Sequence, residues 1–74
     1  MLPLTITKPG ENVDICSFSC SLDEAKRLRE MGCVEGNRAY IISNQNNVIL
    51  QVGQTRLAIN SKLARKILVL PNRP

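Results

Sequence analysis

Three cysteines are the residues of this 74-residue chain most able to bind a metal, since it contains no histidine. Cys16 and Cys20 have a C-x3-C spacing that could bring two thiolates together, and Cys33 could add a third. Zinc and iron–sulfur sites normally use four ligands, and no C-x2-C pair is present. We therefore expect structural or surface thiols and no metal site, with a thiol-ligated metal sensor as an alternative.

The sequence offers little for catalysis. Without histidine the chain lacks the commonest general base, and it has no glycine-rich loop that could hold phosphates. Asp23 and Glu24 are adjacent carboxylates, but a helix start explains both of them. We expect no catalytic residues, no cofactor and no enzyme activity.

A helix is predicted over residues 22–31. Ser21 and Glu24 form a capping box, and Gly32 can take the left-handed conformation that ends a helix. Apolar residues recur every third position and predict a stripe buried against a sheet, formed by Leu22, Ala25, Leu28 and Met31. Arg29 is expected to reach solvent, so that its replacement by alanine should leave stability unchanged.

Short alternating or apolar segments predict strands on both sides of this helix. They cover residues 2–7, 12–18, 38–43, 48–52, 56–60 and 66–70, with a hairpin tip at 44–47 and a helical turn at 61–64. Strands this short and numerous favour one small closed barrel domain spanning residues 1–74. Four apolar residues are out of phase with the inward positions, which indicates either a bulge or an apolar outer surface: Ile42, Ile49, Leu68 and Leu70.

The charge is distributed unevenly along the chain. Residues 1–36 carry six acidic and four basic side chains, whereas residues 37–74 carry six basic and none that is acidic. The basic part could bind nucleic acid through residues 38–73, but Phe18 and Tyr40 are the only aromatic residues, so we expect no nucleic acid partner. With no secretory signal and no apolar stretch long enough to span a bilayer, a cytoplasmic location is expected.

Several short motifs resemble the FeoA family of ferrous iron transport proteins. The segment RLREMG at 27–32, followed by Gly36, resembles the central motif of that family. Leu57, Ala58 and Ile59, then Ala64 and the segment 67–69, resemble its C-terminal signature. The resemblance implies a mainly β fold: a small SH3-like barrel of five to six strands with one inserted helix.

The resemblance also implies a function. FeoA proteins are cytosolic accessory or regulatory proteins of ferrous iron uptake that dock on FeoB, a membrane permease with a cytosolic GTPase domain, so contact with the membrane is expected only through that partner. We expect the docking contact on the helix and the loop after it, at Arg27, Arg29, Cys33, Val34, Glu35 and Arg38. Glu35 stands where the family often has proline. The apolar residues on the outer surface are also compatible with a homo-oligomer, which stays an alternative.

Overall fold

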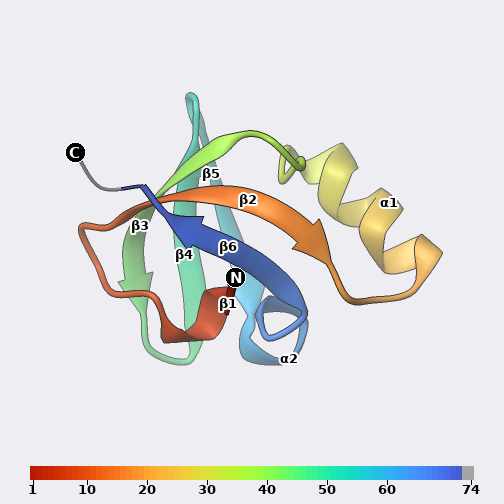
Figure 1. Cartoon of the computed structure of the whole chain (residues 1–74), viewed down its shortest axis with the longest axis horizontal. Helices are drawn as coiled ribbons and strands as arrows, with labels where there is room; N and C mark the ends of the chain where they lie inside the picture. Colours follow the sequence, from red (N-terminus) through yellow and green to blue (C-terminus); the bar gives the residue numbers. More distant parts are fainter. Residues whose placement is uncertain (73–74) are drawn as a thin grey trace.

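The computed structural model describes residues 1–72 and contains six antiparallel strands, one long helix and one short helix. The strands are β1 (Leu2–Pro3), β2 (Asn12–Phe18), β3 (Arg38–Asn44), β4 (Asn47–Val52), β5 (Thr55–Asn60) and β6 (Ile67–Pro71). The helices are α1 (Leu22–Met31) and α2 (Ser61–Ala64), and a single 3-10 turn covers Leu4–Ile6. The predicted mainly β fold with one inserted helix is thus confirmed, and Figure 1 shows α1 projecting to one side between β2 and β3.

The strands form one strongly curved sheet in the order β1-β6-β2-β3-β4-β5. This order leaves β1 and β5 at the two ends, so the small barrel is not closed by strand pairing, contrary to the closed barrel predicted. Instead α2 packs against β5 and against the 3-10 turn, which in turn packs against β6. These two short helical pieces cover the gap between the sheet edges and limit access to their unpaired backbone groups.

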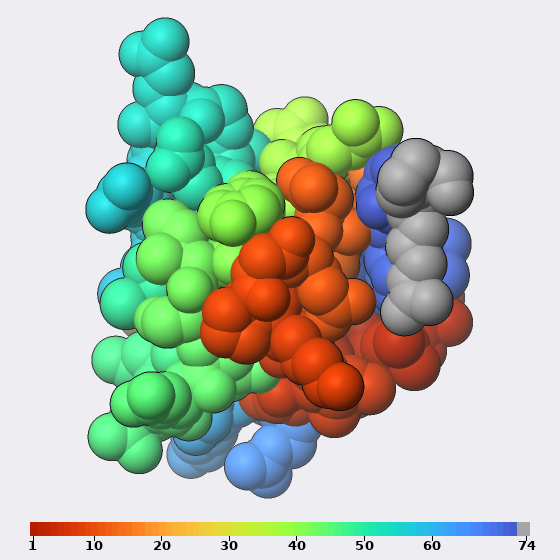
Figure 2. All heavy atoms as spheres, turned by 90° about the vertical axis from the view of Figure 1, so that its left-hand side faces the viewer, coloured from red at the N-terminus to blue at the C-terminus, as the bar shows by residue number. Residues whose placement is uncertain are grey.

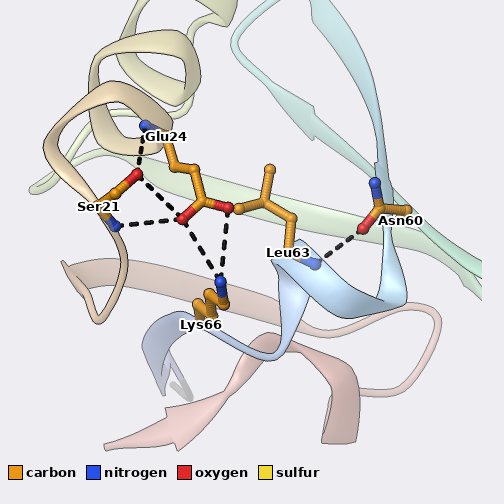
Figure 3. Close-up of polar contacts among 5 residues, drawn as sticks. All are labelled: Ser21, Glu24, Asn60, Leu63 and Lys66. Atoms are coloured by element: carbon orange, nitrogen blue, oxygen red, sulfur yellow. Dashed lines mark hydrogen bonds and ion pairs between the residues drawn. The ribbon is translucent and has the colours of Figure 1, made fainter.

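The local signals at the start of α1 act as predicted. The Ser21 hydroxyl accepts a hydrogen bond from the Glu24 amide at 3.1 Å, and the Glu24 carboxylate accepts one from the Ser21 amide at 3.2 Å. Lys66 Nζ lies 3.4 Å from the same carboxylate and ties the segment before β6 to α1 (Figure 3). The Ser21 amide, with Lys66 adding to it, lowers the pKa of Glu24. At the other end Gly32 has φ +106°, which suits glycine and ends the helix.

The predicted apolar stripe is only half right. Ala25 and Leu28 are buried and Met31 is half-buried, but Leu22 is 88% exposed. Residues three apart turn by about 300° at 3.6 residues per turn, so a strict three-residue repeat winds around the helix. Leu22 and Met31 therefore lie about 180° apart, and only the middle of the stripe can face the core.

The N-terminal segment was predicted as one strand over residues 2–7, and this prediction is wrong beyond Pro3. The Thr7 amide and hydroxyl both donate to the Leu4 carbonyl, which closes the 3-10 turn and buries Leu4 while Ile6 is exposed. The Asn44 amide then donates to the carbonyls of Thr5 and Thr7 at 2.8 and 2.6 Å. A side chain of the hairpin at the end of β3 thus fixes the N-terminal segment.

Both explanations offered for the out-of-phase apolar residues hold. The β3–β4 register shifts at Ile42, which makes it the extra residue of a bulge, and the β2–β6 register shifts likewise at Cys16. Ile49 and Leu68 are instead half-buried on the outer side of their strands, and Leu70 is exposed there. The outer surface of the barrel therefore carries apolar side chains on two separate strands, β4 and β6.

The core fills the barrel with aliphatic side chains from every strand from β2 to β6. Its residues are Leu4, Val13, Ile15, Leu28, Cys33, Ala39, Ile41, Val48, Leu50, Leu57, Ile59, Ala64, Ile67 and Val69. The short helix α2 is capped by the Asn60 side chain, which accepts from the Leu63 amide at 2.8 Å (Figure 3). In residues 1–72 there is no helix with the length and apolar character needed to cross a bilayer.

Candidate functional site

The end of α1 and the loop that follows it are joined by an ion pair between Arg29 and Glu35. Arg29 Nε donates to Glu35 Oε1 at 3.0 Å and Nη2 donates to Oε2 at 2.7 Å, which is the two-pronged geometry that suits guanidinium and carboxylate. The pair remains accessible, with 49% of the Arg29 side chain and 34% of the Glu35 side chain exposed. The Arg29 guanidinium lowers the pKa of Glu35 to about 2, helped by a backbone hydrogen bond to the carboxylate.

Arg29 also covers an aromatic ring. Its guanidinium carbon lies 5.7 Å from the centre of the Phe18 ring at the end of β2, within the range of a cation–π contact. Three elements therefore meet at this side chain: β2, α1 and the loop before β3. Arg29 reaches solvent, as the sequence predicted, but its contacts with Glu35 and Phe18 were not foreseen, because pairs six or more positions apart cannot be inferred from helical spacing.

The loop from Cys33 to Asn37 is fastened to β2. The Gly36 amide donates to the Ile15 carbonyl at 2.8 Å, and the Ile15 amide donates to the Asn37 carbonyl at 2.9 Å. The Asn37 amide closes a turn on the Val34 carbonyl at 3.1 Å. These bonds continue the β2–β3 pairing into the loop and hold Glu35 opposite Arg29.

Cys33 does not lie on the surface, and its prediction as a contact residue is corrected. Its side chain is fully buried in the core, and its amide donates to the Leu28 carbonyl at 2.9 Å. Burial raises the pKa of the Cys33 thiol to about 11, with the Glu35 charge adding to the effect. A buried neutral thiol acts as a small apolar core residue.

The other predicted contact residues fall in two groups. Val34 is half-buried beside Glu35 and belongs with the Arg29–Glu35 pair, whereas Arg27 is exposed on α1 about 200° around the helix from Arg29. Arg38, at the start of β3, has a different partner. Its Nε lies 3.6 Å from Oδ1 of Asp14 on β2. Arg38 also lines a surface hollow of about 330 Å³, which no pattern in the sequence predicted.

The three thiols do not form one ligand set. Cys16 is the bulged residue of β2, and its thiol donates to the Asp14 carbonyl at 3.4 Å. Cys20 is half-buried against the core before α1, and Cys33 lies inside the core. Within residues 1–72 no three cysteine, aspartate or glutamate side chains gather closely enough to hold a metal ion.

Solved structures with the same fold include proteins of iron metabolism. A crystal structure of an iron uptake regulatory protein, FeoA, matches with a TM-score of 0.87 at 24% identity over 96% of each chain. An NMR structure of a FeoA-like protein from Clostridium acetobutylicum matches with a TM-score of 0.84 at 18% identity, over 99% of this chain and 88% of that one. IdeR of T. acidophilum gives 0.88 at 21% identity, over 96% of this chain and 34% of its own. At these identities the likeness shows the fold alone.

Sequence comparison identifies the family. No curated protein sequence gives a match. The family model described as the FeoA domain matches residues 2–71, which is nearly the whole chain and includes every strand and both helices. The motifs that resemble the family in sequence thus lie within one continuous match, and the chain belongs to the FeoA domain family.

Proposed function

We propose that this protein is a non-catalytic accessory protein of ferrous iron transport that acts in the cytoplasm by docking on the GTPase domain of a FeoB-type permease. The observation that carries the proposal is the FeoA domain match over residues 2–71. The name of the FeoA crystal structure, an iron uptake regulatory protein, supports the same role. Small barrels of this kind commonly act by docking, and the site itself must supply the specificity.

The docking surface in this proposal, the α1 surface, consists of Arg27, Arg29, Val34 and Glu35. Arginine is enriched at protein interfaces, where its planar group makes several directed hydrogen bonds. Glu35 and the Phe18 ring hold the Arg29 guanidinium in place before any partner arrives. A side chain that is already ordered loses less conformational entropy on binding, so this arrangement favours docking.

The Arg29–Glu35 pair still has groups to offer a partner. Its two hydrogen bonds use Nε and Nη2 of Arg29, which leaves Nη1 available within the described part of the chain. Arg27 lies two positions earlier on the same helix, is exposed, and makes no ion pair within residues 1–72. The α1 surface therefore presents the Arg29 cation next to one half-buried aliphatic side chain, Val34, and a second cation, Arg27, on another side of the helix.

The test is a pull-down of the intact protein by the permease GTPase domain with a charge-exchange series. Arg29→Glu and Glu35→Arg each place like charges opposite one another, whereas the double variant restores an ion pair of reversed direction. We expect both single variants to weaken capture by roughly tenfold or more, a loss of about 1.4 kcal/mol of binding free energy. Lys8→Glu is the control, because Lys8 is an exposed cation in the segment that joins the 3-10 turn to β2, and Figure 1 shows this loop on the opposite side of the molecule from α1.

The double variant separates two modes of docking. If the double variant restores capture, the permease domain recognises the loop that the ion pair holds in place. If it does not, the permease domain contacts the positive charge of Arg29 directly. Equal capture of all three variants and the wild type would show that docking uses another surface. No capture of the wild-type protein in either nucleotide state would remove the docking proposal.

A further inference from the structure

Four hydrogen-bonding side chains form a row across the outside of the sheet. The strand registers place Asn12 opposite Tyr40, Tyr40 opposite Gln51, and Gln51 opposite Arg56, so the row crosses β2, β3, β4 and β5. Each of the four has at least one buried neighbour in its strand, so by the alternation of a strand these four face outward. Tyr40 is 46% exposed at the middle of the row. We call these four residues the cross-strand row.

The row borders a hollow rather than a flat face. The 330 Å³ hollow is lined by Asn12, Arg38, Ala39, Tyr40, Gln51 and Gly53. Figure 2 looks onto this side of the molecule, where the β4–β5 hairpin (teal) rises beyond β3 (green) and the start of β2 (orange). Gly53 has no side chain and leaves room between larger neighbours, so an extended chain laid across the strands would be partly enclosed.

Hydrogen bonds within the row fix its side chains. The Gln51 amide nitrogen donates to the Gly53 carbonyl at 3.0 Å, and its oxygen accepts from Arg56 Nε at 3.3 Å. Gln51 thus links the hairpin turn to Arg56 and orients the guanidinium. Within residues 1–72 Arg56 makes no ion pair, so its terminal nitrogens are free to meet an incoming carboxylate.

The charge of the hollow is positive. Arg38 lies at its edge with 64% of its side chain exposed, and its 3.6 Å approach to Asp14 is loose for an ion pair. The Asp14 carboxylate also accepts from the Asn72 side-chain amide, so it is shared between Arg38 and a neutral partner. None of the residues that line the hollow is acidic. Arg56 therefore stands at the β5 end of the cross-strand row, and Arg38 lies beside the row, two residues before Tyr40 on β3.

We propose that the cross-strand row binds an extended acidic peptide segment of a protein partner. Four adjacent strands about 4.8 Å apart give a row roughly 14 Å long, which matches about four residues of extended chain. The Asn12 and Gln51 amides and the Tyr40 hydroxyl suit a peptide backbone, and the arginines suit glutamate or aspartate side chains. A single exposed ring does not provide the series of stacking surfaces that single-stranded nucleic acid uses.

This surface is separate from the α1 surface and does not depend on the identity of the partner proposed above. The test is a fluorescence anisotropy titration of the intact protein with a labelled synthetic peptide of alternating glutamate and threonine. The same peptide with glutamine in place of glutamate is the ligand control. A labelled single-stranded RNA is the third probe, because phosphates would also be attracted by two arginines.

The variants are Arg56→Gln and Arg38→Gln, with Lys62→Gln as the matched loss of one positive charge on the exposed side of α2. We expect the wild-type protein to bind the glutamate peptide. The affinity should fall by roughly tenfold in each arginine variant, because one charge-assisted hydrogen bond is lost, and by less than about twofold in Lys62→Gln. Equal affinity for the glutamine peptide, equal loss in all three variants, tighter binding of the RNA, or no binding of the glutamate peptide would each overturn the proposal. A failure here leaves docking through α1 untouched, because the α1 series uses none of these residues.

Discussion

Replacing Leu28 by alanine should destabilise the fold more than any other single change in α1. Only Ala25 and Leu28 of this helix are buried, and Leu28 is fully enclosed in the core. One large side chain therefore holds the helix to the barrel. Truncating a buried leucine to alanine costs about 2–5 kcal/mol, of which part comes from the cavity left behind.

This loss is large for a domain of 74 residues, whose total stability is on the order of 5–15 kcal/mol. Each kcal/mol shifts the midpoint of a domain this small by roughly 4–8 °C, so Leu28→Ala should lower Tm by at least about 8 °C. Urea and thermal unfolding followed by far-ultraviolet circular dichroism measure both quantities, since the chain has no tryptophan to report by fluorescence.

Leu22 provides the matched control. It lies in the same helix and loses the same atoms on replacement by alanine, but it is 88% exposed, so the free energy of unfolding should change by less than about 0.5 kcal/mol. Equal losses in the two variants, or a loss below about 1 kcal/mol in Leu28→Ala, would show that α1 does not pack against the barrel through Leu28.

Three further predictions follow from α1 and its loop. Ser21→Ala removes one side of the capping box and should cost about 1 kcal/mol in urea unfolding, whereas Ser19→Ala, outside the box, should not. The pKa of Glu35 is lowered to about 2 in the folded state, so its stabilising effect is complete above its ordinary value of 4.5 and is lost as pH falls toward 2. Glu35→Gln should therefore flatten the acid side of the stability–pH curve, and an unchanged slope would contradict the ion pair. Cys33, buried and with its pKa raised to about 11, should resist iodoacetamide until the protein unfolds, while the half-buried Cys16 and Cys20 react before it; peptide mass mapping reports the order.

The parts of the fold that the sequence predicted depend on residues close together in the chain. Ser21, Glu24 and Gly32 determine where α1 begins and ends within a dozen positions, and the structure gives the same bounds. Alternation in β2 and β5 likewise identified Val13, Ile15, Leu57 and Ile59 as inward residues. Local hydrogen bonding and periodicity are sufficient for such elements.

The parts that failed depend on contacts between distant segments. The N-terminal 3-10 turn is held by Asn44, which lies more than thirty positions away, and no pattern in residues 2–7 reveals it. Leu22 was placed on the buried face because it fits the three-residue spacing, but that repeat winds around the helix and turns Leu22 away from the core. The position of the helix against the sheet, and not the spacing of its apolar residues alone, decides which face of the helix is buried.

The candidate site shows the same division. Arg29 and Glu35 were both predicted as contact residues, but their pairing and the Phe18 ring beneath them became visible only in three dimensions. Cys33 was misplaced because a thiol in a loop gives no sign of burial. The cross-strand row was missed since its members come from four strands, and only the register brings them together.

The central claim, docking on the permease, is tested most directly by titration calorimetry of the wild-type protein against the isolated GTPase domain of FeoB. The titration is run with GDP and with a non-hydrolysable GTP analogue. The account predicts saturable binding at one site in at least one nucleotide state, weakened by Arg29→Glu and unaffected by Lys8→Glu. Absence of measurable heat and of complex formation in both states, with both proteins folded, would contradict it.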